Sequence, residues 1–210
     1  MPAYFSVTLE FSRKNIFPDF MQNFYSVLSS AGLTFKSGYW GSEQDDLQSI
    51  LNWNQKKLEQ NFKIGYSEHF SHDYKQMLFA FEDFHEIRGF WMNQYPVQDE
   101  FTFEIIIPEY EIFGDEVYSK NQAYIPEKMQ KIQDIACYLW EHFPPVMTIQ
   151  TELEIIGACV PEQAILSGQK LPSAYPFAIV SEETAQNNGF VQFTKSNLGR
   201  NGIFLLSQNY

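Results

Sequence analysis

A strict two-residue alternation over residues 101–107 restricts the fold of this chain more than any other feature of its sequence. The apolar residues Phe101, Phe103, Ile105 and Ile107 alternate there with Thr102, Glu104 and Ile106. A period of two in aromatic and β-branched residues is typical of a β-strand with one buried face. The centre of the protein is therefore predicted to be a β-sheet.

Similar strand patterns recur along the chain. The gaps between the strands predicted from residue 64 to residue 107 are too short for crossover helices, so they favour antiparallel pairing. Gly89, inside one of these strands, is expected to mark a β-bulge. Besides 101–107, the predicted strands cover residues 4–11, 33–40, 75–82, 86–92, 146–156, 177–180, 190–194 and 203–206, with 64–70 as a further candidate.

Apolar residues recur at helical spacing in three longer segments. Pro18 suits the first turn of one helix, and Gly32 ends it. Ser42, with Asp45 three residues later, is predicted to cap a second helix that runs to about residue 61. Pro126 opens a third helix, which ends near residue 142, and a short helix is expected over 161–166. The predicted class is α+β, with a mostly antiparallel sheet of roughly six to nine strands and three main helices packed on it.

The chain of 210 residues shows no internal repeat, no low-complexity tract and no Gly/Ser linker. A single α+β domain over residues 1–210 is therefore expected. Residues 108–125 are predicted to form one long loop, which is the only candidate seam for a division into two parts. Loops of this length are uncommon in compact domains and are often functional.

The overall charge limits the classes of partner. A net charge of −12 argues against nucleic-acid binding and against anionic membrane surfaces. Neither a secretory signal nor an apolar run long enough to cross a bilayer is recognised, so a cytoplasmic location is predicted. Cys137 and Cys159 match no zinc spacing. Free buried thiols are expected, with a single disulfide as the alternative.

The sequence contains no GxSxG, P-loop, GxGxxG or HExxH motif, and no cofactor is predicted. Cys137 and His142 are five residues apart on one predicted helix, which is poor geometry for a nucleophile and its base. His69 and His72 form an HxxH pair, to which His85 could add a third metal ligand. Because the segment has the pattern of a strand end or turn, this spacing places the two side chains on opposite faces, so surface histidines and no metal site are predicted. Residues 82–86, EDFHE, offer carboxylates beside a histidine for acid/base work, although such a run is also typical of a solvated turn.

A second acidic feature overlaps the central strand. Residues 99–116 contain seven carboxylates and no basic residue, interleaved with aromatic side chains. Carboxylates steer a basic protein toward a surface, and aromatic residues supply desolvated anchors for it. The alternative is a solvated edge whose aromatic residues all face inward. The predicted contact residues are Glu104, Glu109, Tyr110, Glu111, Asp115 and Glu116.

In general character the chain resembles the small acidic immunity proteins that bacteria produce against toxins. The shared features are a single acidic, aromatic-rich α+β domain and the lack of catalytic motifs, and no motif carries the resemblance. It implies a non-enzymatic protein that neutralises a basic toxin or nuclease. Two alternatives stay open: a metal-dependent or acid/base enzyme that uses His69, His72, His85 and nearby carboxylates, or a domain that encloses a small ligand among its aromatic residues.

Overall fold

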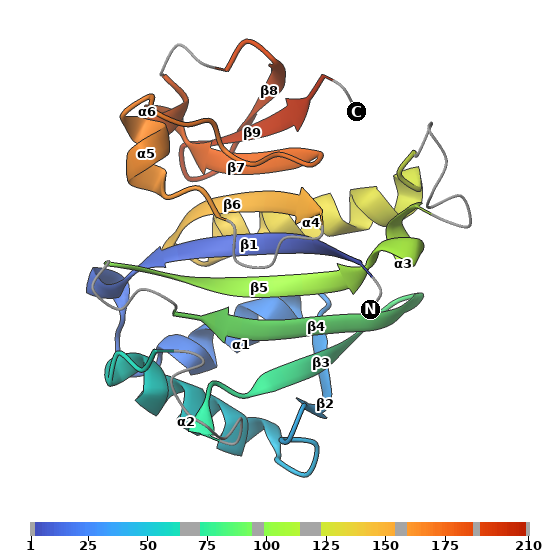
Figure 1. The fold of residues 1–210 in the computed structure, drawn as a ribbon, viewed down its shortest axis with the longest axis vertical. Helices are drawn as coiled ribbons and strands as arrows, with labels where there is room; N and C mark the ends of the chain where they lie inside the picture. Colours follow the sequence, from blue (N-terminus) through green and yellow to red (C-terminus); the bar gives the residue numbers. More distant parts are fainter. Residues whose placement is uncertain are drawn as a thin grey trace.

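We describe a computed structural model of the chain, which covers residues 3–63, 72–93, 99–113, 123–153, 159–186 and 190–208. One antiparallel sheet of nine strands runs through the molecule in the order β2-β3-β4-β5-β1-β6-β7-β9-β8 (Figure 1). This architecture confirms the predicted α+β class and the predicted antiparallel meander of β3, β4 and β5. The strands are β1 (Tyr4–Ser12), β2 (Thr34–Tyr39), β3 (Gln76–Phe81), β4 (Phe84–Met92), β5 (Glu100–Pro108), β6 (Val146–Leu153), β7 (Phe177–Ser181), β8 (Phe193–Leu198) and β9 (Gly202–Ser207).

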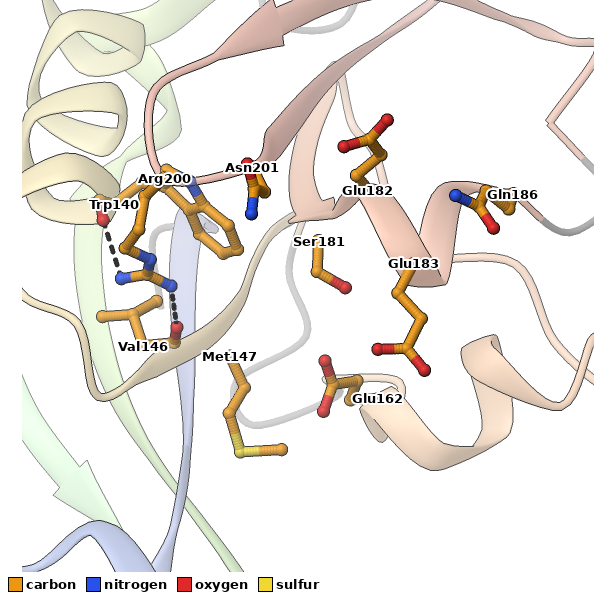
Figure 2. A pocket seen from close by; sticks show the side chains of 10 residues that line it. All are labelled: Trp140, Val146, Met147, Glu162, Ser181, Glu182, Glu183, Gln186, Arg200 and Asn201. Atoms are coloured by element: carbon orange, nitrogen blue, oxygen red, sulfur yellow. Dashed lines mark hydrogen bonds between the residues drawn. The ribbon is translucent and has the colours of Figure 1, made fainter.

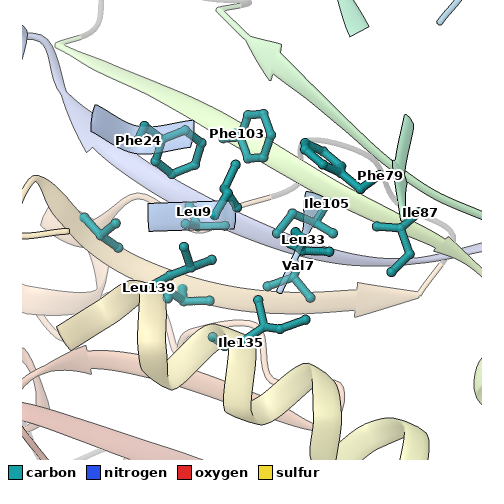
Figure 3. Packing of buried hydrophobic residues seen from close by; sticks show 14 of the residues in the cluster. Val7, Leu9, Phe24, Leu33, Phe79, Ile87, Phe103, Ile105, Ile135 and Leu139 are labelled. Carbon is teal, nitrogen blue, oxygen red and sulfur yellow. The ribbon is translucent and has the colours of Figure 1, made fainter. Parts of the chain in front are cut away.

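The helices lie on both faces of this sheet. The three long ones are α1 (Phe20–Ser30), α2 (Leu47–Glu59) and α4 (Pro126–His142), and the short ones are α3 (Glu109–Phe113), α5 (Glu162–Leu166) and α6 (Glu182–Ala185), with a 3-10 turn at Arg13–Asn15. On the first face, α1, α2 and α4 bury one large core against the sheet. Figure 3 shows Ile135 and Leu139 of α4 against Val7 and Leu9 of β1 in this core.

The second face is divided between a small apolar cluster and a buried polar strip. Ile165 of α5 and Ala185 of α6 form a separate apolar cluster with the side chains of β7 and β9 that point away from the main core. These side chains are Ala178, Val180, Ile203 and Leu205. Further toward the centre of the sheet, the apolar side chains of Phe90 and Ile106 are buried beside a strip of buried polar side chains from β1, β5 and β6. The polar side chains are Ser6, Thr8, Glu10, Glu104, Thr148 and Gln150. The second face is thus buried without being apolar throughout.

Gly89 does not form the predicted bulge. It pairs regularly with Met77 on one side and with Ile105 on the other, and the irregularity of this region lies in β3, between Phe79 and Phe81. A Cβ atom at Gly89 would lie 2.5 Å from the ring of Phe79 and 2.6 Å from the ring of Phe103. The position therefore requires glycine because two aromatic rings of the core fill the space beside the backbone.

Other local predictions also need correction. Asp46 caps α2 by accepting a 2.7 Å hydrogen bond from the Ser49 N–H, whereas Ser42 bonds to the main chain of Tyr39 in the preceding turn. The predicted loop over 108–125 contains the helix α3, and its residues 114–122 lie outside the described part. The strand expected at 190–194 lies at Phe193–Leu198, and α6 was not predicted. The candidate strand 64–70 falls outside the described residues.

Candidate functional site

A pocket of about 520 Å³ opens where α5, α6 and the turn between β8 and β9 meet the end of α4 (Figure 2). Three glutamates, Glu162, Glu182 and Glu183, give it an acidic rim, and Arg200 is its one cationic residue. The remaining lining residues are Trp140, Val146, Met147, Ser181, Gln186 and Asn201. The lining residues come from α4, β6, α5, β7, α6 and the β8–β9 turn, so the pocket exists only once the C-terminal half of the sheet has assembled.

The positive charge of Arg200 is already used within the protein. Its Nη1 donates to the carbonyl oxygens of Trp140 at 2.7 Å and Phe143 at 2.9 Å, and its Nη2 donates to that of Val146. The guanidinium also lies over the Trp140 ring, 4.1 Å from its centroid. Burial lowers the pKa of Arg200 from its usual value, although an arginine stays charged. Arg200 therefore holds the β8–β9 turn against the end of α4 by hydrogen bonds, and it is not paired with the glutamates.

The carboxylates crowd one another on the opposite wall. Figure 2 shows the side chains of Glu162 and Glu183 turned toward the same space below Ser181, with Glu182 directed away. Burial raises the pKa of Glu162, and the nearby charges of Glu183 and Glu100 raise it further. A cation placed between Glu162 and Glu183 would relieve this repulsion.

The hydroxyl of Ser181, which lines this pocket, is used within the fold. The Ser181 hydroxyl caps α6, accepting a hydrogen bond of 3.1 Å from the Thr184 N–H, and it contacts the Thr184 hydroxyl at 2.8 Å. No histidine or cysteine lines the pocket. In the part of the chain that the structure describes, no group of three or more histidine, cysteine or acidic side chains is arranged to hold a metal ion. The geometry suits an organic cation, whose apolar part can lie against Met147.

The acidic sector predicted over residues 99–116 is largely buried. Glu104 has no exposed surface, and its carboxylate accepts hydrogen bonds from the hydroxyls of Thr8 at 2.5 Å and Thr102 at 2.8 Å. The alternation placed it correctly on the face opposite Phe103, but that face is covered at the centre of the sheet. Glu104 therefore cannot contact a partner, and its selection as a contact residue was wrong.

The neighbouring carboxylates on α3 are also enclosed. Glu111 is only 5 % exposed and accepts hydrogen bonds from the N–H groups of His85 at 2.8 Å and Glu86 at 2.9 Å, which ties α3 to β4. Glu109 is buried as well. Both are corrected from contact residues to interior residues, because the helix α3 turns them inward where a loop was expected. Tyr110 is 52 % exposed, and Asp115 and Glu116 lie outside the described residues.

The structure does not assemble the predicted histidine site in the residues that it covers. His72 and His85 are exposed, and neither belongs to a metal-binding group among the described residues. His69 lies outside them. The His85 Nδ1 lies 3.3 Å from a carboxylate oxygen of Glu111. His85 is thus associated with the carboxylate that holds α3.

In the EDFHE run, Asp83 has a structural role. Asp83 forms ion pairs of 2.9 Å with Lys128 and with Lys131, both on α4, so the β3–β4 turn is attached to that helix. These hydrogen bonds lower the pKa of Asp83. Cys137 and Cys159 are free thiols, as expected, but both are partly exposed where buried thiols were predicted. Gln150 donates a 2.9 Å hydrogen bond to the Cys159 sulfur.

The acidic pocket itself was missed from the sequence. Its glutamates are separated by twenty residues of chain, and the C-terminal segment has too few charged residues overall to stand out. The one available signal was the adjacent pair Glu182 and Glu183 directly after a predicted buried strand. That signal gives no location for Glu162, which reaches the pocket from a different helix.

No helix in the described part of the chain is long and apolar enough to span a membrane. Comparison with known proteins finds no family model and no curated protein that matches the chain.

Proposed function

We propose that this protein binds a basic protein and that the acidic pocket receives a lysine or arginine side chain from it. The observation that carries the proposal is the pairing of Glu162 and Glu183 around open space, while Arg200 is held by main-chain carbonyls. A partner cation would be bound by carboxylates in a partly desolvated setting, where charge-assisted hydrogen bonds are strongest.

The shape of the pocket supports a side chain more than a simple ion. Met147 supplies an apolar side chain beside the carboxylates, whereas the Val146 side chain is buried in the main core. Lysine and arginine pack their methylene groups along such surfaces and keep the charged head on the polar side. The net charge of −12 adds long-range attraction for a basic partner and speeds the encounter.

An inhibitor of the immunity type fits these properties. A basic toxin or nuclease has a positive surface built for phosphate, and an acidic protein can cover it. Tyr110, the exposed aromatic residue of the predicted sector, is proposed as a peripheral contact.

The test begins with a pull-down from the source cell, including the products of neighbouring genes, followed by affinity measurements on the purified partner. Removing both charges with Glu162→Gln and Glu183→Gln is expected to weaken binding by roughly 10-fold or more. The matched control removes two exposed charges elsewhere, Asp19→Asn and Glu127→Gln, and is expected to change the affinity by about 2-fold or less.

Three results would overturn the proposal. The first is the absence of a stoichiometric basic partner. The second is an equal loss of affinity in the pocket variant and in the control, which would assign the effect to net charge alone. The third is a small organic cation that native mass spectrometry detects on the protein and that the pocket substitutions release. If its release leaves partner binding unchanged, the pocket serves the small cation and not a protein side chain.

A further inference from the structure

We propose that the free edge of β8 binds an extended, acidic peptide strand of a partner protein, with one apolar side chain of that strand seated in a second pocket. This surface lies apart from the acidic pocket, and the inference does not depend on the function proposed above. It rests on the edge hydrogen-bonding groups, the exposed apolar residues and the local charge.

The second pocket, of about 370 Å³, lies beside the first residue of β8. It is lined by Tyr124, Leu171, Pro172, Ala174, Tyr175, Pro176, Gln192, Phe193 and Ser207. Leu171 is 41 % exposed, Tyr175 57 % and nearby Val191 84 %, so three of the five large exposed apolar residues in the described part of the chain gather at this corner. Such a concentration of exposed apolar side chains marks an interaction surface.

The main chain of β8 offers regular hydrogen-bonding groups to a new strand. β8 pairs only with β9 in the described sheet, and its register runs without a shift from Phe193 to Leu198. The Gln208 N–H donates to the Gln192 carbonyl at 3.2 Å. This bond makes residues 192 and 208 a hydrogen-bonded pair, and in an antiparallel ladder every second pair is of this kind. Residues 194, 196 and 198 therefore direct their N–H and C=O groups to β9, whereas Lys195 and Asn197 direct theirs to the free edge.

The opposite edge of the sheet lacks this regularity. The pairing of β2 with β3 shifts between Phe35 and Ser37. Bulges of this kind protect an edge from further pairing. β8 has neither a bulge nor a proline, and Lys195 is its only charged residue.

Charge selects an acidic strand as the occupant. No carboxylate lines the second pocket, and none occurs in β8, although the protein as a whole is acidic. Lys195 stands two residues from Phe193, so both side chains lie on the same face, about 7 Å apart along the strand. A bound strand that places an apolar residue opposite Phe193 therefore places its residue two positions away opposite Lys195. The expected ligand pattern is an apolar residue and an aspartate or glutamate at that spacing.

The experiment uses end-blocked, fluorescein-labelled six-residue peptides, with leucine and glutamate two positions apart and threonine elsewhere. A second peptide carries lysine in place of glutamate. Fluorescence anisotropy with the full chain is expected to show tighter binding of the glutamate peptide. Lys195→Glu is expected to reverse this preference, with a change of about 5-fold in the affinity ratio.

The hydrogen-bonding groups are tested separately at Asn197. Asn197→Pro removes an edge N–H without removing a bond to β9, and it is expected to weaken peptide binding by about 10-fold. Asn197→Ala keeps that N–H and is expected to bind like the original protein. Urea unfolding of both variants checks that the fold is retained.

Other outcomes contradict the proposal. Equal affinity for the two peptides would reject the charge-selected strand, and unaltered binding by Asn197→Pro would reject pairing at the edge. Failure of either peptide to bind at millimolar concentration would reject the site. A concentration-dependent dimer that Asn197→Pro abolishes would assign the edge to a second copy of this chain.

Discussion

At the scale of single residues, Glu10 shows how a charged side chain is held in the interior of the sheet. It is 1 % exposed, accepts a 2.7 Å hydrogen bond from the Thr148 hydroxyl and accepts the Glu162 N–H at 3.0 Å. Burial nevertheless raises the pKa of Glu10 to about 7. The hydrogen bonds therefore compensate only part of the lost hydration.

This raised pKa predicts a specific dependence of stability on pH. Because the folded state holds the Glu10 proton more tightly than the unfolded state, the stabilisation is complete below about pH 4.5 and is lost as pH rises through about 7. The loss amounts to roughly 3 kcal/mol. Glu10→Gln keeps a neutral acceptor for the Glu162 N–H, so its unfolding free energy should fall less between pH 5 and pH 8.

Urea unfolding of the original protein and of Glu10→Gln at both pH values measures this difference. Glu152 and Glu162, whose pKa values burial also raises, contribute to both proteins in the same direction. The difference between the two profiles therefore reports on Glu10 together with its electrostatic coupling to Glu162. Parallel pH profiles for the two proteins would show that Glu10 does not titrate in this range.

At the scale of elements, the turn between β8 and β9 is fixed to the end of α4. Arg200 donates to three carbonyl oxygens there, and the Trp140 Nε1–H donates to the Gly199 carbonyl at 3.1 Å. Gly202 has to be glycine, because a Cβ atom would lie 2.2 Å from the Trp140 Nε1. The acidic pocket thus depends on a turn that is positioned from outside its own hairpin.

Arg200→Lys is expected to lower the free energy of unfolding by about 1.5–3 kcal/mol, because an ammonium group cannot serve three acceptors held in a guanidinium geometry. Urea unfolding measures the loss, and hydrogen exchange is expected to show faster exchange at residues 199–202. Lys56→Met, which removes an exposed cation, is the control and is expected to change stability by less than about 0.5 kcal/mol. An equally stable Arg200→Lys protein would show that the hydrogen bonds of Arg200 to the end of α4 do not stabilise the fold.

At the scale of the whole molecule, β1 joins the two halves of the chain. It pairs with β5 along residues 4–12 on one side and with β6 along residues 5–11 on the other. The segment from α4 to the C-terminus therefore has no complete core without the first strand. The main hydrophobic cluster likewise combines Phe20 and Phe24 with Leu139 and Trp140.

This arrangement predicts one cooperative unfolding transition. Far-UV circular dichroism and tryptophan fluorescence, which reports on residues in both halves, are expected to give the same midpoint in urea. A fragment of residues 123–210 expressed alone is expected to stay unfolded. Two separated transitions, or a folded fragment, would divide the chain at the predicted seam.

The sequence alone determined most of the local elements of this protein, although it did not identify α3 and α6. Alternation identified β1, β3, β5 and β6. Helical spacing identified α1, between Pro18 and Gly32, and α4, which begins at Pro126. These patterns are readable because each element buries one side against the core, so its period appears in the order of residues. The pattern over 33–40 also identified the strand β2, although its edge position did not follow from it.

The candidate site was decided by the tertiary structure. Glu104 sits on the face that alternation assigned to solvent, yet the second face of the sheet is buried at β5 and β1. Conversely, Glu162 and Glu183 form a site only because α5 and α6 fold onto β7. Exposure depends on what covers a residue, and the covering segments lie far away in the sequence. A one-dimensional period therefore fixes the direction of a side chain within its element, whereas packing decides whether that direction leads to water.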